Sequence, residues 1–357
     1  FAAMEWLYKA LECYTYITFR SLAFKVLAVI AMFAFVHTKE DYIKYAGIVV
    51  LANTGYGVLN LFNLRNHITF RRFKDYQIRR HLKPVFIFFA MTVATTIYSN
   101  LDVTMLGFMR DNAEVGYYDV AVKIKVILVN VVTSLGAVLL PRTSYYVEMK
   151  MDKEFRAVSG KALEFVTVLA IPLTVGFTIM AKQCILFLSG NAYLPSVTPM
   201  RVIMPTLILI GASNVFGVQM LVPLGREKLV LYSECAGAVT DIILNAICIP
   251  KYGAAGAAFG TVMAEAVVLI VQVASLKDMA IEIIQKLEIW KIILSVMAAG
   301  SVMELIQKKN EIGTFLMLIV CFAAFWAIYG LMLFIFRERV LLEILETIKH
   351  GRKKIGE

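Results

Sequence analysis

Residues 254–275 read AAGAAFGTVMAEAVVLIVQVAS, and Glu265 is the only charged residue among them. A transmembrane helix needs about 20 consecutive, mostly apolar residues, so this segment can cross a bilayer. Transmembrane strands are excluded, because such strands have about 9–11 residues of alternating polarity, whereas this segment is about twice as long and mostly apolar on all sides. Ten segments of this kind are predicted to span the membrane: 15–36, 42–62, 84–108, 117–140, 161–181, 200–222, 229–249, 254–275, 287–306 and 313–336. The expected fold is an all-α, polytopic membrane bundle.

The composition supports this prediction. Of the 357 residues, 60% are hydrophobic and 17% are charged, whereas soluble domains average about 45–50% and about 25%. A soluble enzyme, a disordered chain and a disulfide scaffold are therefore excluded. The cysteines occur singly without a C-x-x-C pair, and the histidines fall between the apolar runs. No metal site and no cofactor is predicted.

Lys and Arg alternate between the two sides of the predicted bundle. The connectors on one side, with the C-terminal tail, hold 22 of them and the opposite side holds 6. By the positive-inside rule the basic side is cytoplasmic and the protein lies in the cytoplasmic membrane. The basic runs are short and bracketed by spans, so they indicate topology and contact with lipid headgroups rather than nucleic-acid binding. The chain begins with Phe inside an interfacial segment, which predicts an incomplete N-terminus.

Charged residues inside apolar spans are functional candidates because burying a charge in hydrocarbon is costly. Asp102 lies near the outer end of the third span, at the depth expected for Asp119 and Lys123 of the fourth. Asp119 and Lys123 are four residues apart and can pair on one helix face, so a structural ion pair is an open alternative to a cavity role. Lys125 is rotated by about 200° from Lys123 and has no acidic partner on its own helix. It is the stronger cavity candidate.

Four further charged residues lie in the first, seventh and eighth spans. Arg20 is expected to extend to the inner surface or to face a cavity, while Lys25 is too deep to do the former. Asp241 and Glu265 are expected near the midplane. They form a proton or sodium site, or they act as counter-ions to cationic side chains, and both interpretations stay open. Polar side chains in the spans predict interhelical hydrogen bonds; they are Asn130, Asn214, Asn245 and Gln219.

Other patterns concern packing. Gly256-x-x-x-Gly260 predicts close helix contact, and Pro172 and Pro205 predict kinks within spans. The sequence contains no G-x-x-x-x-G-K-[ST] motif, so it has no P-loop for nucleotide hydrolysis.

Four segments carry a family resemblance: EWLYKALECYTYITFR at 5–20, SNLDVTMLGFMRDNAEVGYYDVAVKI at 99–124, AYLPSVTPMRVIMPTLILIGASNVFGVQMLVPLGREK at 192–228, and IPKYGAAGAAFGTVMAEAVV at 249–268. They resemble polysaccharide repeat-unit flippases (Wzx type) of the multidrug/oligosaccharidyl-lipid/polysaccharide exporter superfamily. That family commonly has fourteen spans, which would make the ten predicted here spans five to fourteen. The resemblance implies that basic residues of the lobes line the cavity; Lys123 and Lys125 lie within a matching segment, and Asp102 matches the family's acidic position beside the Leu-Gly step.

The resemblance implies two pseudo-symmetric six-helix lobes around a cavity that opens alternately to each side. The substrate it implies is an oligosaccharide repeat unit on undecaprenyl pyrophosphate, and the partners are membrane lipids and the polysaccharide polymerase and chain-length machinery. Coupling to H⁺ or Na⁺ is consistent with such a cycle. The implied divisions are the rest of the N-terminal lobe (1–62), a basic connector (63–83), the C-terminal lobe (84–275), two additional spans (276–336) and a basic amphipathic tail (337–357).

Two alternatives to a flippase remain. A multidrug or small-solute cation antiporter of the same fold would favour an acidic, apolar cavity over a cationic one. An integral-membrane polymerase or ligase would carry a sizeable outer loop with catalytic charge, whereas the outer connectors here are short. The expectation is therefore a transporter rather than an enzyme.

Overall fold

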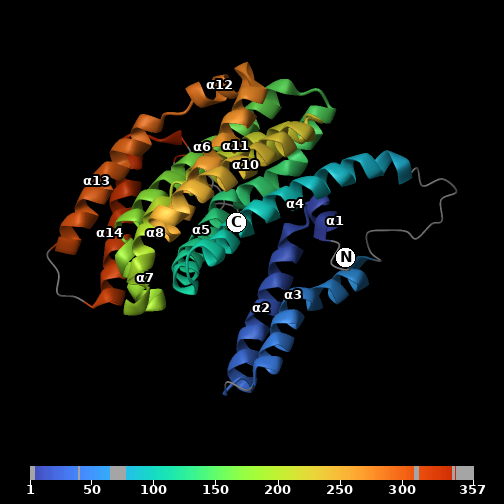
Figure 1. Ribbon diagram of the computed structural model, residues 1–357. Helices are drawn as coiled ribbons and strands as arrows, with labels where there is room; N and C mark the ends of the chain where they lie inside the picture. Colours follow the sequence, from blue (N-terminus) through green and yellow to red (C-terminus); the bar gives the residue numbers. More distant parts are fainter. Residues whose placement is uncertain (1–4, 39–40, 65–77, 309–312, 340–341, 343–357) are drawn as a thin grey trace, which may run out of the picture. The chain divides into compact units, whose positions relative to one another are not determined.

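The computed structural model of the protein describes residues 5–38, 41–64, 78–308, 313–339 and 342 (Figure 1). Every regular element within these residues is a helix, which confirms the predicted all-α class. The chain divides into two compact units, Phe1–Arg80 and His81–Glu357. Most of the predicted connector 63–83 and of the predicted amphipathic tail 337–357 lies outside the described residues.

The first unit is built from two long helices and one short one. Helix α1 (Glu5–Ala10) precedes α2 (Tyr14–Phe35) and α3 (Tyr42–Leu64), which correspond to the first two predicted spans and pack against each other. The Tyr8 hydroxyl donates a 2.9 Å hydrogen bond to the backbone carbonyl of Asn60. This bond ties the short helix to α3.

The second unit contains the remaining helices, and α4 (Ile78–Met109) lies almost entirely within it. The others are α5 (Asn112–Glu148), α6 (Asp152–Ile179), α7 (Ala181–Ser189), the 3₁₀ helix η2 (Asn191–Ser196), α8 (Val197–Ile203), α9 (Thr206–Ser213), the π-helix η3 (Asn214–Leu221), α10 (Glu227–Tyr252), α11 (Ala254–Leu276), α12 (Asp278–Gln285), α13 (Ile289–Lys308) and α14 (Thr314–Ile335). Helix α13 packs against both α6 and α14. The predicted divisions 84–275 and 276–336 therefore share one compact unit.

Seven of the described helices are long and apolar enough to cross a membrane, namely α2, α5, α6, α10, α11, α13 and α14. The predicted span 200–222 is broken, because Asn191–Ile203 and Thr206–Leu221 meet at an angle of 44° on either side of Pro205. Counting this bent pair as one span gives eight. The kink expected at Pro205 is confirmed, whereas α6 runs through Pro172 without interruption.

The other two predicted spans are helical but less apolar. Helix α3 carries Asn53, Asn60 and Asn63, and the first turns of α4 are basic. Neither helix meets the same test of length and composition. The multi-pass membrane fold is thus confirmed, but the predicted count of ten spans exceeds the seven or eight that the test supports.

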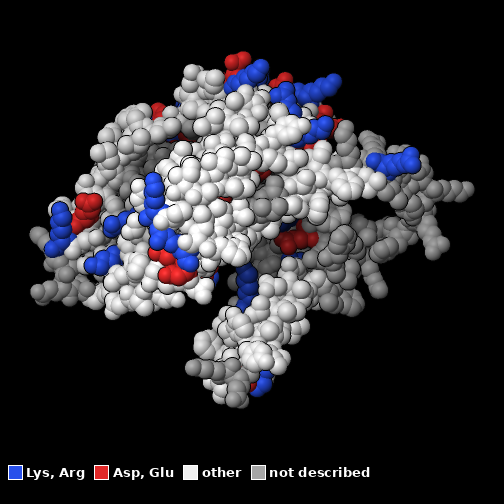
Figure 2. Space-filling model, viewed as in Figure 1, with Lys and Arg blue, Asp and Glu red and all other residues white. Residues whose placement is uncertain are grey.

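Helices α10 and α11 are in close contact along their length, as the glycine pattern predicts. A Cβ atom on Gly256 would lie 2.5 Å from the backbone carbonyl oxygen of Cys248, so only glycine allows this approach. In the view of Figure 2, Lys, Arg, Asp and Glu of the second unit gather towards its ends, and a broad uncharged surface lies between them. This distribution fits a bundle whose middle faces hydrocarbon.

Candidate functional site: a buried carboxylate cluster beside a polar cavity

Asp102 is the centre of a polar cluster formed by four helices of the second unit. Its side chain on α4 is only 2% exposed. One carboxylate oxygen, Oδ1, accepts a 2.6 Å hydrogen bond from Nδ2 of Asn245 on α10. The other oxygen, Oδ2, accepts hydrogen bonds from the hydroxyl of Thr261 on α11, at 2.9 Å, and from the hydroxyl of Tyr118 on α5. Three donors from three helices suit an ionised carboxylate, because hydrogen bonds to a charged acceptor are stronger than neutral ones.

The two hydroxyls are held together by this shared acceptor. Tyr118 and Thr261 have their oxygens 2.9 Å apart, and each hydroxyl carries one proton. With the Tyr118 proton directed to Asp102, the Thr261 proton goes to Asp102 or to the backbone carbonyl of Ala257, 3.1 Å away. The contact between the hydroxyls thus follows from their binding to Asp102. Removing that carboxylate would take the acceptor from both hydroxyls and from Asn245.

Two more carboxyl groups lie one helical turn from these donors. Asp241 is fully buried and precedes Asn245 by four residues on α10, and Glu265 follows Thr261 by four residues on α11 and is also buried. Residues four apart share a helix face. Among the described residues, neither carboxyl oxygen of Asp241 has a hydrogen-bond partner, although the group lies next to Asp102 and Asn245. Three acidic groups therefore converge where an uncompensated negative charge would be costly.

Lys125 provides a cation in the same place. This residue of α5 lies within electrostatic range of Asp102, Asp241 and Glu265. It lines a cavity of about 270 Å³ to which Asp102 and Glu265 also contribute. The other polar residues that line this cavity are Tyr118, Asn130, Ser213, Asn214, Glu234, Thr261 and Gln272. One lysine opposite three carboxyl groups leaves the cluster with an acidic excess, which a proton or a small cation can balance.

A second hydrogen-bonded series extends along the cavity wall. The Gln272 side chain on α11 accepts a 3.0 Å hydrogen bond from the Ser213 hydroxyl and donates one of 3.1 Å to the Ser233 hydroxyl. A Cβ atom on Gly217, in the π-helix η3, would lie 2.8 Å from Nε2 of Gln272, so glycine makes room for this amide. π-Helical turns occur frequently at functional sites. The broken span therefore supplies an irregular backbone beside the cavity and, at Gly217, a close contact with the Gln272 amide.

Gly260 also makes room for the cluster. A Cβ atom at this position would overlap Oδ1 of Asn245 and would lie 3.2 Å from Oδ1 of Asp241. The sequence pattern predicted only helix packing for Gly256-x-x-x-Gly260. The structure separates the two glycines, since Gly256 faces backbone and Gly260 faces the side chains that surround Asp102.

Asp119 and Lys123 are located elsewhere. They form the expected i,i+4 ion pair at 2.6 Å, with side chains that are 45% and 72% exposed. Asp102 lies beside this turn of α5, as its expected depth implies, but it is buried and takes no part in the ion pair. Asp102 contacts Tyr118, and Asp119 is the next residue, which turns its side chain by about 100° around α5. Matching depth along two helices does not place two side chains on facing surfaces.

In the first unit, the expectation that Arg20 extends to the surface is not met. Arg20 is buried on α2, donates a hydrogen bond to Oδ1 of Asn60 and lies over the ring of Tyr56. Lys25, five residues further, is exposed within this unit. Of the charged candidates, Asp102, Lys125, Asp241 and Glu265 are thus brought together by the described part of the second unit.

The polar side chains in the spans behave in two ways. The predicted interhelical bond of Asn245 is present, but Gln219 donates to Asn214 at 3.2 Å within η3 itself. Sequence reasoning missed Tyr118 and Thr261 as functional candidates. The spacing of four between Thr261 and Glu265, which matches that between Asp241 and Asn245, was the available signal.

A family profile described as "Polysaccharide biosynthesis protein" matches residues 1–147. A "Putative O-antigen transporter" of Escherichia coli K12 is 26% identical over 230 residues, which are 62% of this chain and 54% of that protein. A "Probable flippase AglR" of Haloferax volcanii is 30% identical over 172 residues, which are 46% of this chain and 35% of the relative. The chain thus spans about half the length of the bacterial relative and about a third of the archaeal one.

The fold is similar to a solved structure as well. "Lipid II flippase MurJ, inward closed conformation" matches 90% of this chain and 67% of that chain, with a TM-score of 0.66 and 17% identity. At this identity the likeness concerns the fold. The family profile and the named relatives make the chain similar, over part of its length, to polysaccharide-biosynthesis proteins, transporters and flippases.

Proposed function

We propose that this chain belongs to a flippase that moves undecaprenyl-pyrophosphate-linked oligosaccharide repeat units from the cytoplasmic to the outer leaflet of the cell membrane by alternating access. A charged, hydroxylated headgroup cannot cross hydrocarbon unaided, since each desolvated polar group costs several kcal/mol. The flippase and transporter relatives favour lipid-linked saccharides as the substrate class. The proposal includes the predicted orientation, with the basic loops in the cytoplasm and the polymerase and chain-length machinery as partners downstream.

The observation that carries the proposal is the cavity beside the buried cluster. Lys125 supplies positive charge for a phosphate, and the amides of Asn130, Asn214 and Gln272 supply hydrogen bonds for sugar hydroxyls. Lys25 and Arg20 of the first unit stay predicted substrate-binding candidates, with no placement relative to this cavity. Lys123 is a weaker candidate, because its ammonium is already paired with Asp119 on an exposed face.

Coupling to H⁺ or Na⁺ is assigned to the acidic cluster. The buried oxygens of Asp241 that accept no hydrogen bond among the described residues are suited to receive a proton or to contact a small cation. Binding there would remove the acidic excess around Lys125 and so change the charge of the cavity wall. This gives the cluster a means of linking cation occupancy to the affinity for an anionic headgroup.

The experiment compares two lysines of one helix. The full-length protein would be expressed in a strain that lacks its flippase, with Lys125→Ala and, as the matched control, Lys123→Ala. Surface polysaccharide and the lipid-linked repeat units of the inner leaflet would be quantified at equal protein level. We expect the Lys125 variant to lose surface polysaccharide and to accumulate repeat units, while the control retains both near wild-type values. Equal effects of the two substitutions would contradict the cavity assignment.

One observation favours a second candidate, a cation-coupled antiporter of small cationic solutes. The cavity is lined by three carboxyl groups and a single lysine, and this acidic excess would attract a cationic substrate; the residues are Asp102, Glu234, Glu265 and Lys125. The same strain distinguishes the two functions. Cation-dependent drug efflux without restored polysaccharide would favour the antiporter and exclude the flippase.

A further inference from the structure

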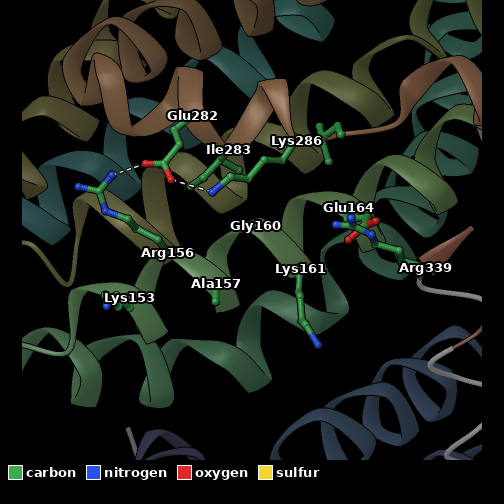
Figure 3. A pocket seen from close by; sticks show the side chains of 11 residues that line it. Lys153, Arg156, Ala157, Gly160, Lys161, Glu164, Glu282, Ile283, Lys286 and Arg339 are labelled. Atoms are coloured by element: carbon green, nitrogen blue, oxygen red, sulfur yellow. Dashed lines mark hydrogen bonds and ion pairs between the residues drawn. The ribbon is translucent and has the colours of Figure 1, made fainter.

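A second cavity lies at the end of the second unit, between α6, α12 and Arg339, which lies four residues beyond the end of α14 (Figure 3). Its volume is about 440 Å³, within the range of small-molecule sites. Five basic and two acidic side chains line it, which leaves a net charge of +3: Lys153, Arg156, Lys161, Lys286 and Arg339, with Glu164 and Glu282. Because these residues come from three separate parts of the chain, folding creates a basic site that no short sequence motif reveals.

Some of these charged residues connect α12 to α6 through an ion pair. The Glu282 carboxylate accepts a 2.5 Å hydrogen bond from Arg156 and one of 2.7 Å from Lys286 (Figure 3). The neighbouring Lys286 and Arg156 hold the pKa of Glu282 below its ordinary value. The positive excess remains after this carboxylate is counted. Ile283 of α12 is buried and forms an apolar wall beside Gly160.

The position of the cavity matches the depth of lipid headgroups. Helix α12 joins the end of the span α11 to the start of α13, and Ile281 on it is exposed. At the start of α13, Trp290 is 55% exposed and has its ring 5.7 Å from that of Phe336 and 5.8 Å from the Lys291 ammonium. Exposed tryptophans beside lysines are typical of the membrane–water interface. Below this belt α13 exposes Ile293, Leu294 and Met297, a surface against which acyl chains can lie.

We propose that this cavity, the basic pocket, binds the phosphate headgroup of an anionic phospholipid from the leaflet on the basic side of the protein. Arg and Lys side chains recognise phosphate by charge-assisted hydrogen bonds, and basic pockets beside transmembrane helices suit lipids with anionic headgroups. A headgroup with two separate phosphodiester groups, such as that of cardiolipin, suits the excess of positive charge. Bound lipid would bridge Lys153 and Lys161 of α6 to α12, and so stabilise the linker between α11 and α13.

The test measures cardiolipin binding to the purified full-length protein in phosphatidylcholine nanodiscs by native mass spectrometry. The variant Lys153→Ala/Lys161→Ala keeps the Arg156–Glu282–Lys286 contacts intact. With about a fivefold loss for each basic side chain, we expect cardiolipin affinity to fall by about 30-fold. The matched control, Lys182→Ala/Lys308→Ala, removes the same charge from α7 and α13 and is expected to bind like the wild type.

Three results would overturn the proposal. One is equal loss of affinity in the variant and the control, which would indicate general electrostatic attraction. Another is unchanged cardiolipin binding by the Lys153→Ala/Lys161→Ala variant. The third is stabilisation of the wild type by inorganic pyrophosphate in solution with no effect of cardiolipin, which would make the ligand a soluble phosphate. The charge-conserving variant Lys153→Arg/Lys161→Arg should bind cardiolipin normally, and equal melting temperatures of the alanine variant and the wild type in phosphatidylcholine nanodiscs exclude a folding defect as the cause of lost binding.

Discussion

In the first unit, the Arg20 guanidinium lies 4.4 Å from the centroid of the Tyr56 ring and 5.7 Å from that of Tyr16, and it donates to the side chain of Asn60. These neighbours all come from the adjacent helices α2 and α3. In the second unit, Asp102 takes its three hydrogen bonds from α5, α10 and α11. Both charges are buried, but the first is stabilised within one helix pair and the second by four helices.

The difference follows from the chemistry of the two groups. A guanidinium is weakly hydrated and stacks on aromatic faces, so a few neighbours suffice to accommodate it. A carboxylate can only accept hydrogen bonds, so it needs donors directed at each oxygen. The packing of the helices that supply these donors therefore depends on the charge of the carboxylate. A change of protonation or cation occupancy beside Asp102 therefore reaches α4, α5, α10 and α11 together, whereas the described contacts of Arg20 lie within α2 and α3.

The largest predicted effect is that of Asp102→Ala. The substitution leaves the donors of Tyr118, Thr261 and Asn245 without their acceptor, at about 1 kcal/mol or more each. We expect the free energy of unfolding to fall by about 3 kcal/mol, and transport to be lost. Equilibrium unfolding of the purified full-length protein measures the first and restoration of polysaccharide the second. A variant as stable as the wild type would contradict the donor arrangement.

Gly260→Ala should cause the next largest loss of stability, because the added methyl group overlaps the Asn245 amide and displaces it from Asp102. Overpacking of this kind costs about 1–3 kcal/mol. Combining it with Asn245→Ala removes the clash, so the two substitutions should destabilise less than the sum of their separate effects. A double-mutant cycle checks this coupling. Strict additivity would mean that Gly260 serves only general packing.

Arg20→Lys tests the other side of the comparison. Lysine keeps the charge but loses the planar group that lies over Tyr56, and we expect a cost of about 1–2 kcal/mol. Because only α2 and α3 are involved, its effect should add to that of Asp102→Ala in the double variant. Coupling between these two positions, measured by unfolding, would disprove the local character of the Arg20 site.

The smallest effect concerns pH and the exposed Glu282. Its pKa in the folded state is lowered by Lys286 and Arg156 from the ordinary value of 4.5. The unfolded chain therefore takes up a proton first as the pH falls. The stabilisation is complete above pH 4.5 and disappears as the pH drops through the folded-state pKa. The melting temperatures of the wild type and Glu282→Gln should differ slightly at neutral pH and converge in acid; a constant difference would contradict the assignment.

The sequence predicted the charged members of the site but not their partners. Asp102, Lys125, Asp241 and Glu265 are conspicuous because charges in apolar spans are costly. Tyr118 carries no such cost in a membrane helix, and its role depends on which face of α5 meets α4. Helix rotation is a property of tertiary packing, so the common depth of Asp102 and Asp119 does not reveal that Asp119 turns away to pair with Lys123 on an exposed face.

The same limit explains the fold predictions that succeeded and failed. Apolar length alone identifies helices such as α11, and Pro205 marks the broken span. The burial of Arg20 depends on rings contributed by α2 and α3, so the snorkelling expected from its position did not hold. The basic pocket joins residues from 153 to 339 and has no local signature.

In the proposed cycle the carboxylate cluster, and not acidic charge in general, couples a cation gradient to transport. Proteoliposomes that contain the full-length protein and a fluorescent lipid-linked oligosaccharide, under an imposed H⁺ or Na⁺ gradient, provide the test. Asp241→Asn is compared with Asp119→Asn, its matched control on the exposed face of α5. We expect gradient-dependent flipping to disappear in the Asp241→Asn variant and to persist in the Asp119→Asn variant. Gradient-dependent flipping by the Asp241→Asn variant at the wild-type rate would contradict it.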